Sequence, residues 1–211
     1  MPSTDDEREA LTTGVHLAAF STVLLVVIGL VWDVPWQVTV LFVVASVAVS
    51  GLITVMTLGY VRSAAQRKAM TQGALDTWAG RNGGTFGTNP AALASDVQGW
   101  ELPTSPRFRG ELLAVGRCQG IEVGVACSIE DVGEAGTSIT AVLLRLPEQR
   151  PTARLRRRRD IRRLDLPQGV DSVETDGHEL RVRFEGWPQS PTAVDTLVDA
   201  VVRLAASPLD T

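Results

Sequence analysis

The sequence has few of the residues on which metal sites and most catalytic sites depend. Its 211 residues include two cysteines, two histidines and a single lysine, Lys68, and the preference for arginine over lysine is typical of a high-GC genome. Two cysteines in a chain of this length form no disulfide framework, and His16 and His178 lie too far apart in the sequence for a local metal motif. His-x-x-Glu, Cys-x-x-Cys and Gly-x-Ser-x-Gly patterns are also absent. We therefore expect no catalytic residues, no cofactor and no metal site.

Charge is missing from two long stretches near the N-terminus. Leu11–Trp32 and Val34–Val61 contain no Asp, Glu, Lys or Arg, and neither stretch shows a polar face. A bilayer core requires about 20 apolar residues in helical form. A cleaved signal peptide would begin with basic residues and would not be followed at once by a second span, whereas the first ten residues here are acidic. The sequence thus predicts two transmembrane helices joined by a tight turn at Asp33–Trp36.

Residues that favour the membrane surface border both stretches. The predicted interface anchors are Trp32, Trp36, Tyr60 and Arg62. Basic residues follow the second stretch and the turn has none, so the positive-inside rule places the turn outside and both termini in the cytoplasm. No ionisable residue lies at mid-membrane depth, which disfavours a transporter or channel. We interpret His16 as an interfacial residue.

Small residues recur at a spacing of four within the two stretches. Gly14 and Ala18 form one such pair, and Ser46 and Ser50 form another. Small residues at this spacing let helix backbones approach closely. The pattern is compatible with a packed hairpin or an oligomer contact, and equally with ordinary small-residue content.

A helix and a glycine-rich segment are predicted after the membrane. Met70, Ala74 and Trp78 recur every four residues and indicate a narrow apolar stripe on a helix. The segment Gly80–Pro90 has no following Gly-Lys-Ser/Thr, so we interpret it as a linker and turn and not as a phosphate loop. A short helix is predicted over Pro90–Trp100.

The rest of the chain predicts strands and a closing helix. Gln119-Gly120 indicates a two-residue hairpin whose register places Leu112 opposite Cys127. Cys118 and Cys127 then share a face but lie about 20 Å apart, too far for a disulfide. Asp176-Gly177 indicates a second hairpin. Near-continuous apolar residues predict a central strand over 137–147, and Ser190 predicts the N-cap of an amphipathic helix.

We therefore predict an α+β protein: an N-terminal transmembrane helical hairpin, then a mainly antiparallel β-sheet domain with a C-terminal packing helix. The predicted parts are an acidic cytoplasmic tail at 1–10, the hairpin at 11–61, a membrane-exit helix and glycine-rich linker at 62–89, and a cytoplasmic domain at 90–211.

Seven arginines lie between Ala153 and Arg163, and they are the residues with a candidate binding role. They are Arg154, Arg156, Arg157, Arg158, Arg159, Arg162 and Arg163. A strand over Thr152–Arg158 followed by a turn is predicted. Three interpretations remain open: a charged edge strand that blocks unwanted pairing, attraction to anionic lipid of the inner leaflet, or contact with nucleic acid or an acidic partner, the acidic tail of this chain included. Nucleic acid is the least favoured, because no aromatic residue for base stacking lies between Phe108 and Phe184.

One cluster of acidic residues is a candidate for acid–base chemistry. Glu130, Asp131 and Glu134 lie close together in the sequence, and paired carboxylates can do acid–base work. Their glycine- and serine-containing surroundings favour an exposed loop.

Several segments resemble a loose group of small membrane proteins of unknown function from high-GC Gram-positive bacteria. These segments are the apolar hairpin, "WAGRNGGTF", "LLRLPEQRP" and "ELRVRFEGWPQSPTAVDTLVDAVVRLA". The chain departs from that group in its many arginines after the "LPEQRP" turn. The resemblance implies the architecture and no activity, ligand or functional residue.

The resulting hypothesis is a non-enzymatic, multi-pass protein of the inner cell membrane that presents a cytoplasmic domain. The domain is expected to bind anionic lipid, a protein partner or a second copy of the chain. The alternatives are a small accessory subunit that contacts a larger membrane complex through the hairpin, and an enzyme whose site is not visible in the sequence.

Overall fold

A computed structural model describes most of the chain in two compact units, Met1–Ala69 and Met70–Thr211. The described residues are 12–13, 15–16, 19–24, 26–28, 32, 35–89, 108–132, 135–161 and 163–207. Helix α2 (Trp36–Arg81) contributes to both units. The helix predicted over Pro90–Trp100 lies outside the described residues.

Helix α2 is 46 residues long, and it is long and apolar enough to cross a membrane. It begins after Pro35, whose carbonyl accepts from the amides of Val38 and Thr39 at 2.9 and 3.2 Å. It ends where Gly83 adopts a left-handed conformation with φ 62°, which only glycine adopts at little cost. The glycine-rich segment therefore contains the predicted turn. It also contains a short strand, β1 (Thr85–Gly87), which the sequence analysis missed.

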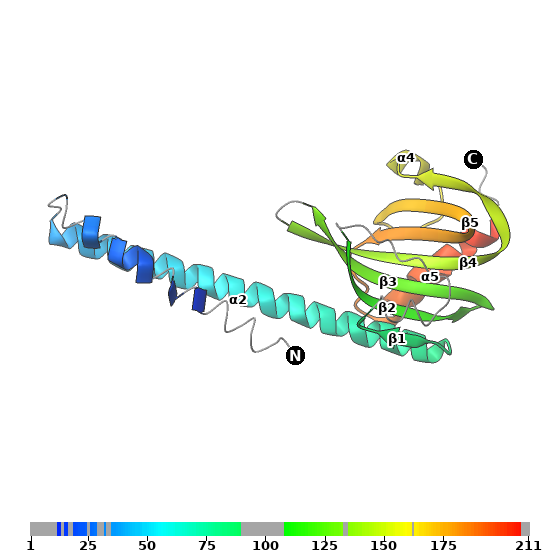
Figure 1. Cartoon of the computed structure of the whole chain (residues 1–211), viewed down its shortest axis with the longest axis horizontal. Helices are drawn as coiled ribbons and strands as arrows, with labels where there is room; N and C mark the ends of the chain where they lie inside the picture. The colour runs from blue at the N-terminus through cyan, green and yellow to red at the C-terminus, as the bar shows by residue number, and fades with distance from the viewer. Residues whose placement is uncertain are drawn as a thin grey trace. The chain divides into compact units, whose positions relative to one another are not determined.

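The second unit is an α+β domain built on one antiparallel sheet (Figure 1). Its strands lie in the order β1-β2-β3-β4-β5, so every neighbour in space is also a neighbour in sequence. The other elements are β2 (Phe108–Cys118), β3 (Ile121–Val132), β4 (Ala135–Leu155), α4 (Arg158–Ile161), β5 (Val170–Glu185) and α5 (Pro191–Ala206). The predicted fold class of the domain is confirmed, including its C-terminal helix. The predicted membrane hairpin is shown only in part, as one long apolar helix, α2.

The hairpin between β2 and β3 has the predicted register. Leu112 lies opposite Cys127, and the strands join through Gln119 and Gly120, whose φ angles of 53° and 80° suit a two-residue hairpin turn. Cys118 and Cys127 consequently lie on the same face of the sheet, and both are free thiols.

The predicted hairpin at Asp176-Gly177 is wrong. Both residues lie inside β5, which pairs along its length with β4 from Ile139↔Glu185 to Leu155↔Val173. Between Arg145↔Glu179 and Arg150↔Gly177 the β4 side has more residues than the β5 side, so Gly177, with φ 59°, lies at a bulge. Pro147 and Pro151 lie in this irregular part of β4, where a missing N–H disrupts no regular ladder.

The main core lies on one face of the sheet, between the strands, α5 and the last turns of α2, and a smaller cluster of buried residues lies on the other face. Ala74, Leu75 and Trp78 of α2 are at most 2% exposed, whereas Met70, predicted to share their stripe, is 40% exposed. Helix α5 is capped as predicted, because the Ser190 side chain accepts from the amide of Ala193 at 3.2 Å. Its buried residues are Val194, Val198, Ala200, Val201, Val202, Leu204 and Ala205.

Candidate functional site

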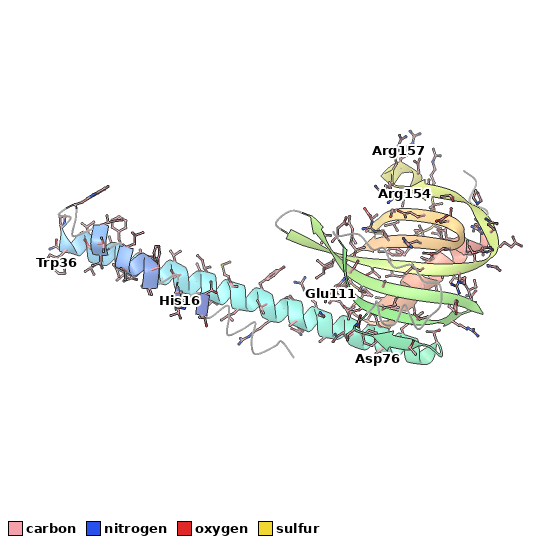
Figure 2. All side chains as sticks on the ribbon, in the orientation of Figure 1. His16, Trp36, Asp76, Glu111, Arg154 and Arg157 are labelled. Atoms are coloured by element: carbon pink, nitrogen blue, oxygen red, sulfur yellow. The ribbon has the colours of Figure 1, made fainter. Side chains whose placement is uncertain are left out.

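The apolar part of α2 is largely exposed. Only 6% of its most apolar stretch is buried, so these side chains do not form a buried core. Trp36 and Tyr60, near the two ends of the charge-free stretch, are 71% and 70% exposed. Figure 2 shows Trp36 at the start of α2. Trp32 and Arg62, the other predicted anchors, are exposed as well. Indole and phenol rings favour the headgroup region of a bilayer.

The predicted small-residue pair on α2 lies at a helix–helix contact within the first unit. The hydroxyl of Ser46 donates to that of Ser21, on the preceding helical segment, at 3.0 Å. Ser50, one turn further along, is only 6% exposed in a helix whose neighbouring side chains are largely exposed. Small side chains thus let the two helical segments approach closely at this point along α2.

The arginine-rich segment leaves the end of β4 and passes through the single turn α4. Arg154 is still on the strand, and its Nε lies 2.6 Å from Glu174 Oε1, the residue opposite it on β5. Arg156, Arg157, Arg159 and Arg163 follow with exposed side chains, and Figure 2 shows Arg157 pointing away from the sheet. The side chain of Arg158 and the whole of Arg162 lie outside the described residues. The strand predicted over Thr152–Arg158 therefore ends three residues early, at Leu155.

Apolar residues between the arginines fix the segment to the domain. Ile161 is 6% exposed, and Leu155, Leu164 and Leu166 pack against the main core. Successive backbone hydrogen bonds also hold the turn, with the Arg157 carbonyl accepting from Asp160 and Ile161 at 2.9 and 3.1 Å. These four apolar residues share no helical stripe in the sequence, but the turn brings all of them towards the core. The arginines are consequently displayed from a fixed backbone.

The edge-strand interpretation agrees with the pairing of β4 only in part. β3 pairs with β4 as far as Val123↔Leu144, and beyond that point the pairing of β4 is with β5. Residues 150–155 of β4 thus have a strand on one side only, which is the situation in which charged side chains block further pairing. Arg150 has a different role, because its guanidinium donates to the carbonyls of Ala205 and Ser207 at the C-terminus of α5. No sequence pattern predicts this contact, because it joins residues that are 55 and 57 positions apart in the chain.

The acidic cluster of the sequence is not an exposed loop where the structure describes it. Glu130 and Asp131 belong to β3, and Glu134 lies outside the described residues. Glu130 Oε2 lies 3.0 Å from Arg183 Nη2 on the sheet face opposite the main core. Glu130 is therefore held in an ion pair that reaches across the sheet from β3 to β5.

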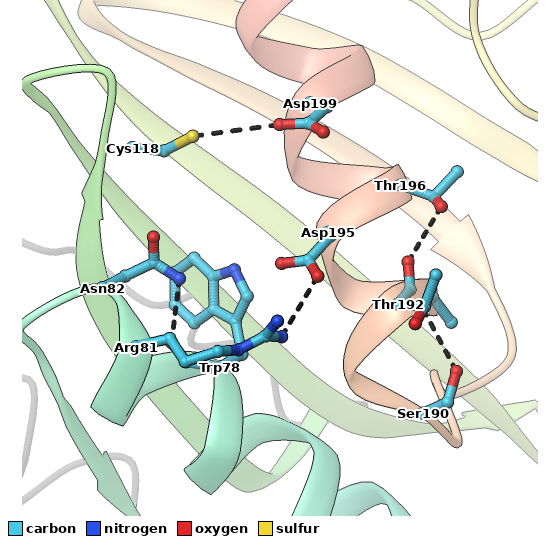
Figure 3. A network of polar contacts seen from close by, with 10 residues as sticks. Trp78, Arg81, Asn82, Cys118, Ser190, Thr192, Asp195, Thr196 and Asp199 are labelled. Carbon is cyan, nitrogen blue, oxygen red and sulfur yellow. Dashed lines mark hydrogen bonds and ion pairs between the residues drawn. The ribbon is translucent and has the colours of Figure 1, made fainter.

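A polar network joins the end of α2 to α5 within the domain (Figure 3). Arg81 lies 3.1 Å from Asp195, and the thiol of Cys118 donates to Asp199 at 3.9 Å. The pKa of the Cys118 thiol is raised, mainly by partial burial and to a smaller extent by the negative charges of Asp199 and Asp195. Because the thiolate is the nucleophile, this environment suppresses the reactivity of Cys118.

The other two candidate reactive groups are Cys127 and His178. Burial raises the pKa of Cys127 to about 12, with a smaller opposing effect of the hydrogen bond to Thr140. His178 is exposed, with Nδ1 3.3 Å from the carbonyl oxygen of Leu146. Among the described residues, no group of three or more His, Cys, Asp or Glu side chains is arranged to hold a metal ion.

Comparison with known proteins adds no relative. No protein-family model matches the chain, and neither does any curated protein or any solved structure. The functional argument therefore depends on the geometry of this chain alone.

Proposed function

We propose that the protein is a non-enzymatic integral membrane protein whose two apolar helices hold a cytoplasmic α+β domain at the inner face of the cell membrane. In this function the domain is a binding module and performs no chemistry. The observation that carries the proposal is the difference in burial between the two ends of α2. Its N-terminal part exposes almost all of its apolar side chains, whereas Leu75 and Trp78, near its C-terminal end, are fully buried in the core of the domain.

A stable water-soluble chain does not leave so large an apolar surface in contact with solvent. The charge-free part of α2, residues 36–61, is 26 residues long, which at 1.5 Å per residue is about 39 Å. A bilayer core is about 30 Å thick. The stretch is therefore long enough to cross with some tilt.

The hydrogen bond between Ser21 and Ser46 supports a second span. It places an apolar helical segment of residues 19–24 against the apolar part of α2. Two apolar helices that contact each other at mid-length are expected of a transmembrane hairpin with a short turn. With Arg62, Arg67 and Lys68 following the charge-free part of α2, the positive-inside rule puts both termini in the cytoplasm.

Cysteine accessibility in intact cells tests the topology. In a background of Cys118→Ser and Cys127→Ala, single cysteines are introduced by Ser3→Cys, Gln37→Cys and Ser63→Cys and treated with a membrane-impermeant maleimide. The proposal expects labelling at position 37 in intact cells, and labelling at positions 3 and 63 only after permeabilisation. Extraction at alkaline pH, which releases peripheral proteins, should leave the chain in the membrane fraction.

The alternatives give different patterns. Labelling at both 3 and 37 in intact cells would mean a single span with the N-terminus outside. Release of the unmodified chain by alkaline extraction would contradict integration in the membrane altogether.

A further inference from the structure

We infer that the exposed arginines of residues 156–163 form a binding surface for the phosphate headgroups of anionic lipids. This surface, here called the arginine surface, consists of Arg156, Arg157, Arg159 and Arg163. The inference deepens the proposed function, on which it rests, by naming what the cytoplasmic domain binds.

The arginine surface has a large local excess of positive charge. Residues 153–166 contain seven arginines and two aspartates, Asp160 and Asp165, which gives 7 − 2 = +5, although the whole chain carries −4. Only Arg154, which is not part of the surface, forms an ion pair among the arginines described in this segment. Arg156, Arg157, Arg159 and Arg163 form none with the described residues, so their donors face solvent.

The geometry of the segment suits phosphate. A guanidinium group offers a planar fork of donors that can bind two phosphate oxygens at once, and it loses less hydration on binding than an ammonium group. The backbone that carries these groups is already ordered, because Leu155 and Ile161 pack on the domain and the Arg157 carbonyl accepts two amide hydrogen bonds. Binding therefore orders only side chains, which reduces its entropic cost.

Two observations favour a lipid surface over nucleic acid. First, α2 is long and apolar enough to cross a membrane, and a domain tethered to a bilayer meets its headgroups at a high effective concentration. Second, single-stranded nucleic acids are held by aromatic side chains as well as by charge. No aromatic residue lies between Phe108 and Phe184, so the arginine surface has no neighbour in the sequence on which a base could stack.

The test uses the full chain in nanodiscs of neutral phosphatidylcholine, mixed with vesicles of phosphatidylcholine alone or with added phosphatidylglycerol. Vesicle binding is measured by flotation. The test variant is Arg157→Ser with Arg159→Ser. The matched control, Arg117→Ser with Arg203→Ser, removes the same charge from exposed positions on β2 and α5. All four side chains are exposed, and circular dichroism checks that both variants keep their fold.

The inference predicts binding to the phosphatidylglycerol vesicles and not to the neutral ones. Each juxtamembrane arginine contributes about five-fold to such binding, so the test variant should bind about 25-fold more weakly. The control variant should lose no more than about two-fold, and raised salt should weaken binding of every form.

Four outcomes would overturn the inference. The first is no binding to anionic vesicles, and the second is an equal loss of vesicle binding in the test and control variants. The third is displacement of the vesicles by inorganic phosphate but not by chloride at the same ionic strength, which would make free phosphate the ligand. The fourth is tighter binding to single-stranded RNA than to vesicles, lost in the test variant. Failure of the proposed function is seen separately, because a chain that does not span the membrane already fails the extraction and labelling experiments.

Discussion

Replacing Trp78 by alanine tests whether the last turns of α2 belong to the core of the domain. The Trp78 side chain is 1% exposed, and its ring lies over Gly116 of β2, where an added Cβ would come within 3.3 Å of the indole Cη2 atom. Removing a fully buried tryptophan costs about 3–5 kcal/mol of unfolding free energy, since both the burial and the packing around the cavity are lost. That is a large fraction of the stability of an ordinary domain.

The measurement is urea unfolding of the full chain in nanodiscs, followed by the β-sheet signal in circular dichroism. With an m value of about 2 kcal/mol per molar, Trp78→Ala should lower the unfolding midpoint by about 2 M. Trp36→Ala is the matched control, because that indole is 71% exposed and belongs to the other unit. It should leave the midpoint of the domain unchanged.

A second substitution sharpens the test. Gly116→Ala alone should destabilise the domain by about 1–3 kcal/mol, because its Cβ would come within 3.0 Å of Asn82 Cβ and within 3.3 Å of the indole Cη2 atom. In the Trp78→Ala background that cost should fall in part, since the ring is gone while Asn82 remains. If Trp78→Ala and Trp36→Ala had the same effect, or if the two costs at positions 78 and 116 simply added, the packing of α2 against β2 described above would be refuted.

Three further predictions address the domain. Arg150→Met should lower the unfolding free energy of the domain by about 1–2 kcal/mol, measured by urea unfolding, because the carbonyls of Ala205 and Ser207 lose a charged donor at the end of α5. The control Arg203→Met, which removes the exposed arginine from the last turn of α5, should lower it clearly less. Gly177→Ala should lower the unfolding free energy by about 1 kcal/mol, because position 177 has a positive φ, and Gly177→Asn should lower it less. An unchanged unfolding midpoint for Gly177→Ala would contradict a left-handed backbone conformation at this position. Asp199→Asn should lower the raised pKa of Cys118 by removing a negative charge, so alkylation of this thiol should speed up near pH 8 while Cys127 stays unreactive in the folded protein. An unchanged alkylation rate would mean that burial and Asp195 raise that pKa without Asp199.

Features set by neighbouring residues were predictable from the sequence. The two-residue turn at Gln119-Gly120 fixes the β2–β3 register, and the cap at Ser190 fixes the start of α5. The charge-free length of α2 likewise identified a helix able to cross a membrane. Each of these depends on composition or on residues a few positions apart, which is why local patterns predict them.

The misjudged features depend on distant partners. Asp176-Gly177 has the composition of a hairpin turn, but it lies within β5, where it pairs with the irregular part of β4. Thr85–Gly87 has too few residues for a strand pattern and is a strand only because β2 lies beside it. Met70 fits the spacing of the buried stripe, yet the buried face of α2 is formed by Thr71, Leu75 and Trp78, and Met70 lies outside it.

The sequence by itself determined that the chain has a charge-free helix of membrane length, an antiparallel α+β domain and a concentrated group of arginines, because length, alternation and charge are properties of contiguous residues. Only the tertiary structure decided what those arginines do locally. It pairs Arg154 with Glu174, directs Arg150 to the end of α5 and leaves Arg156, Arg157, Arg159 and Arg163 exposed on a fixed turn. The physical reason is that a guanidinium is neutralised or exposed according to which distant group the fold places within hydrogen-bonding distance.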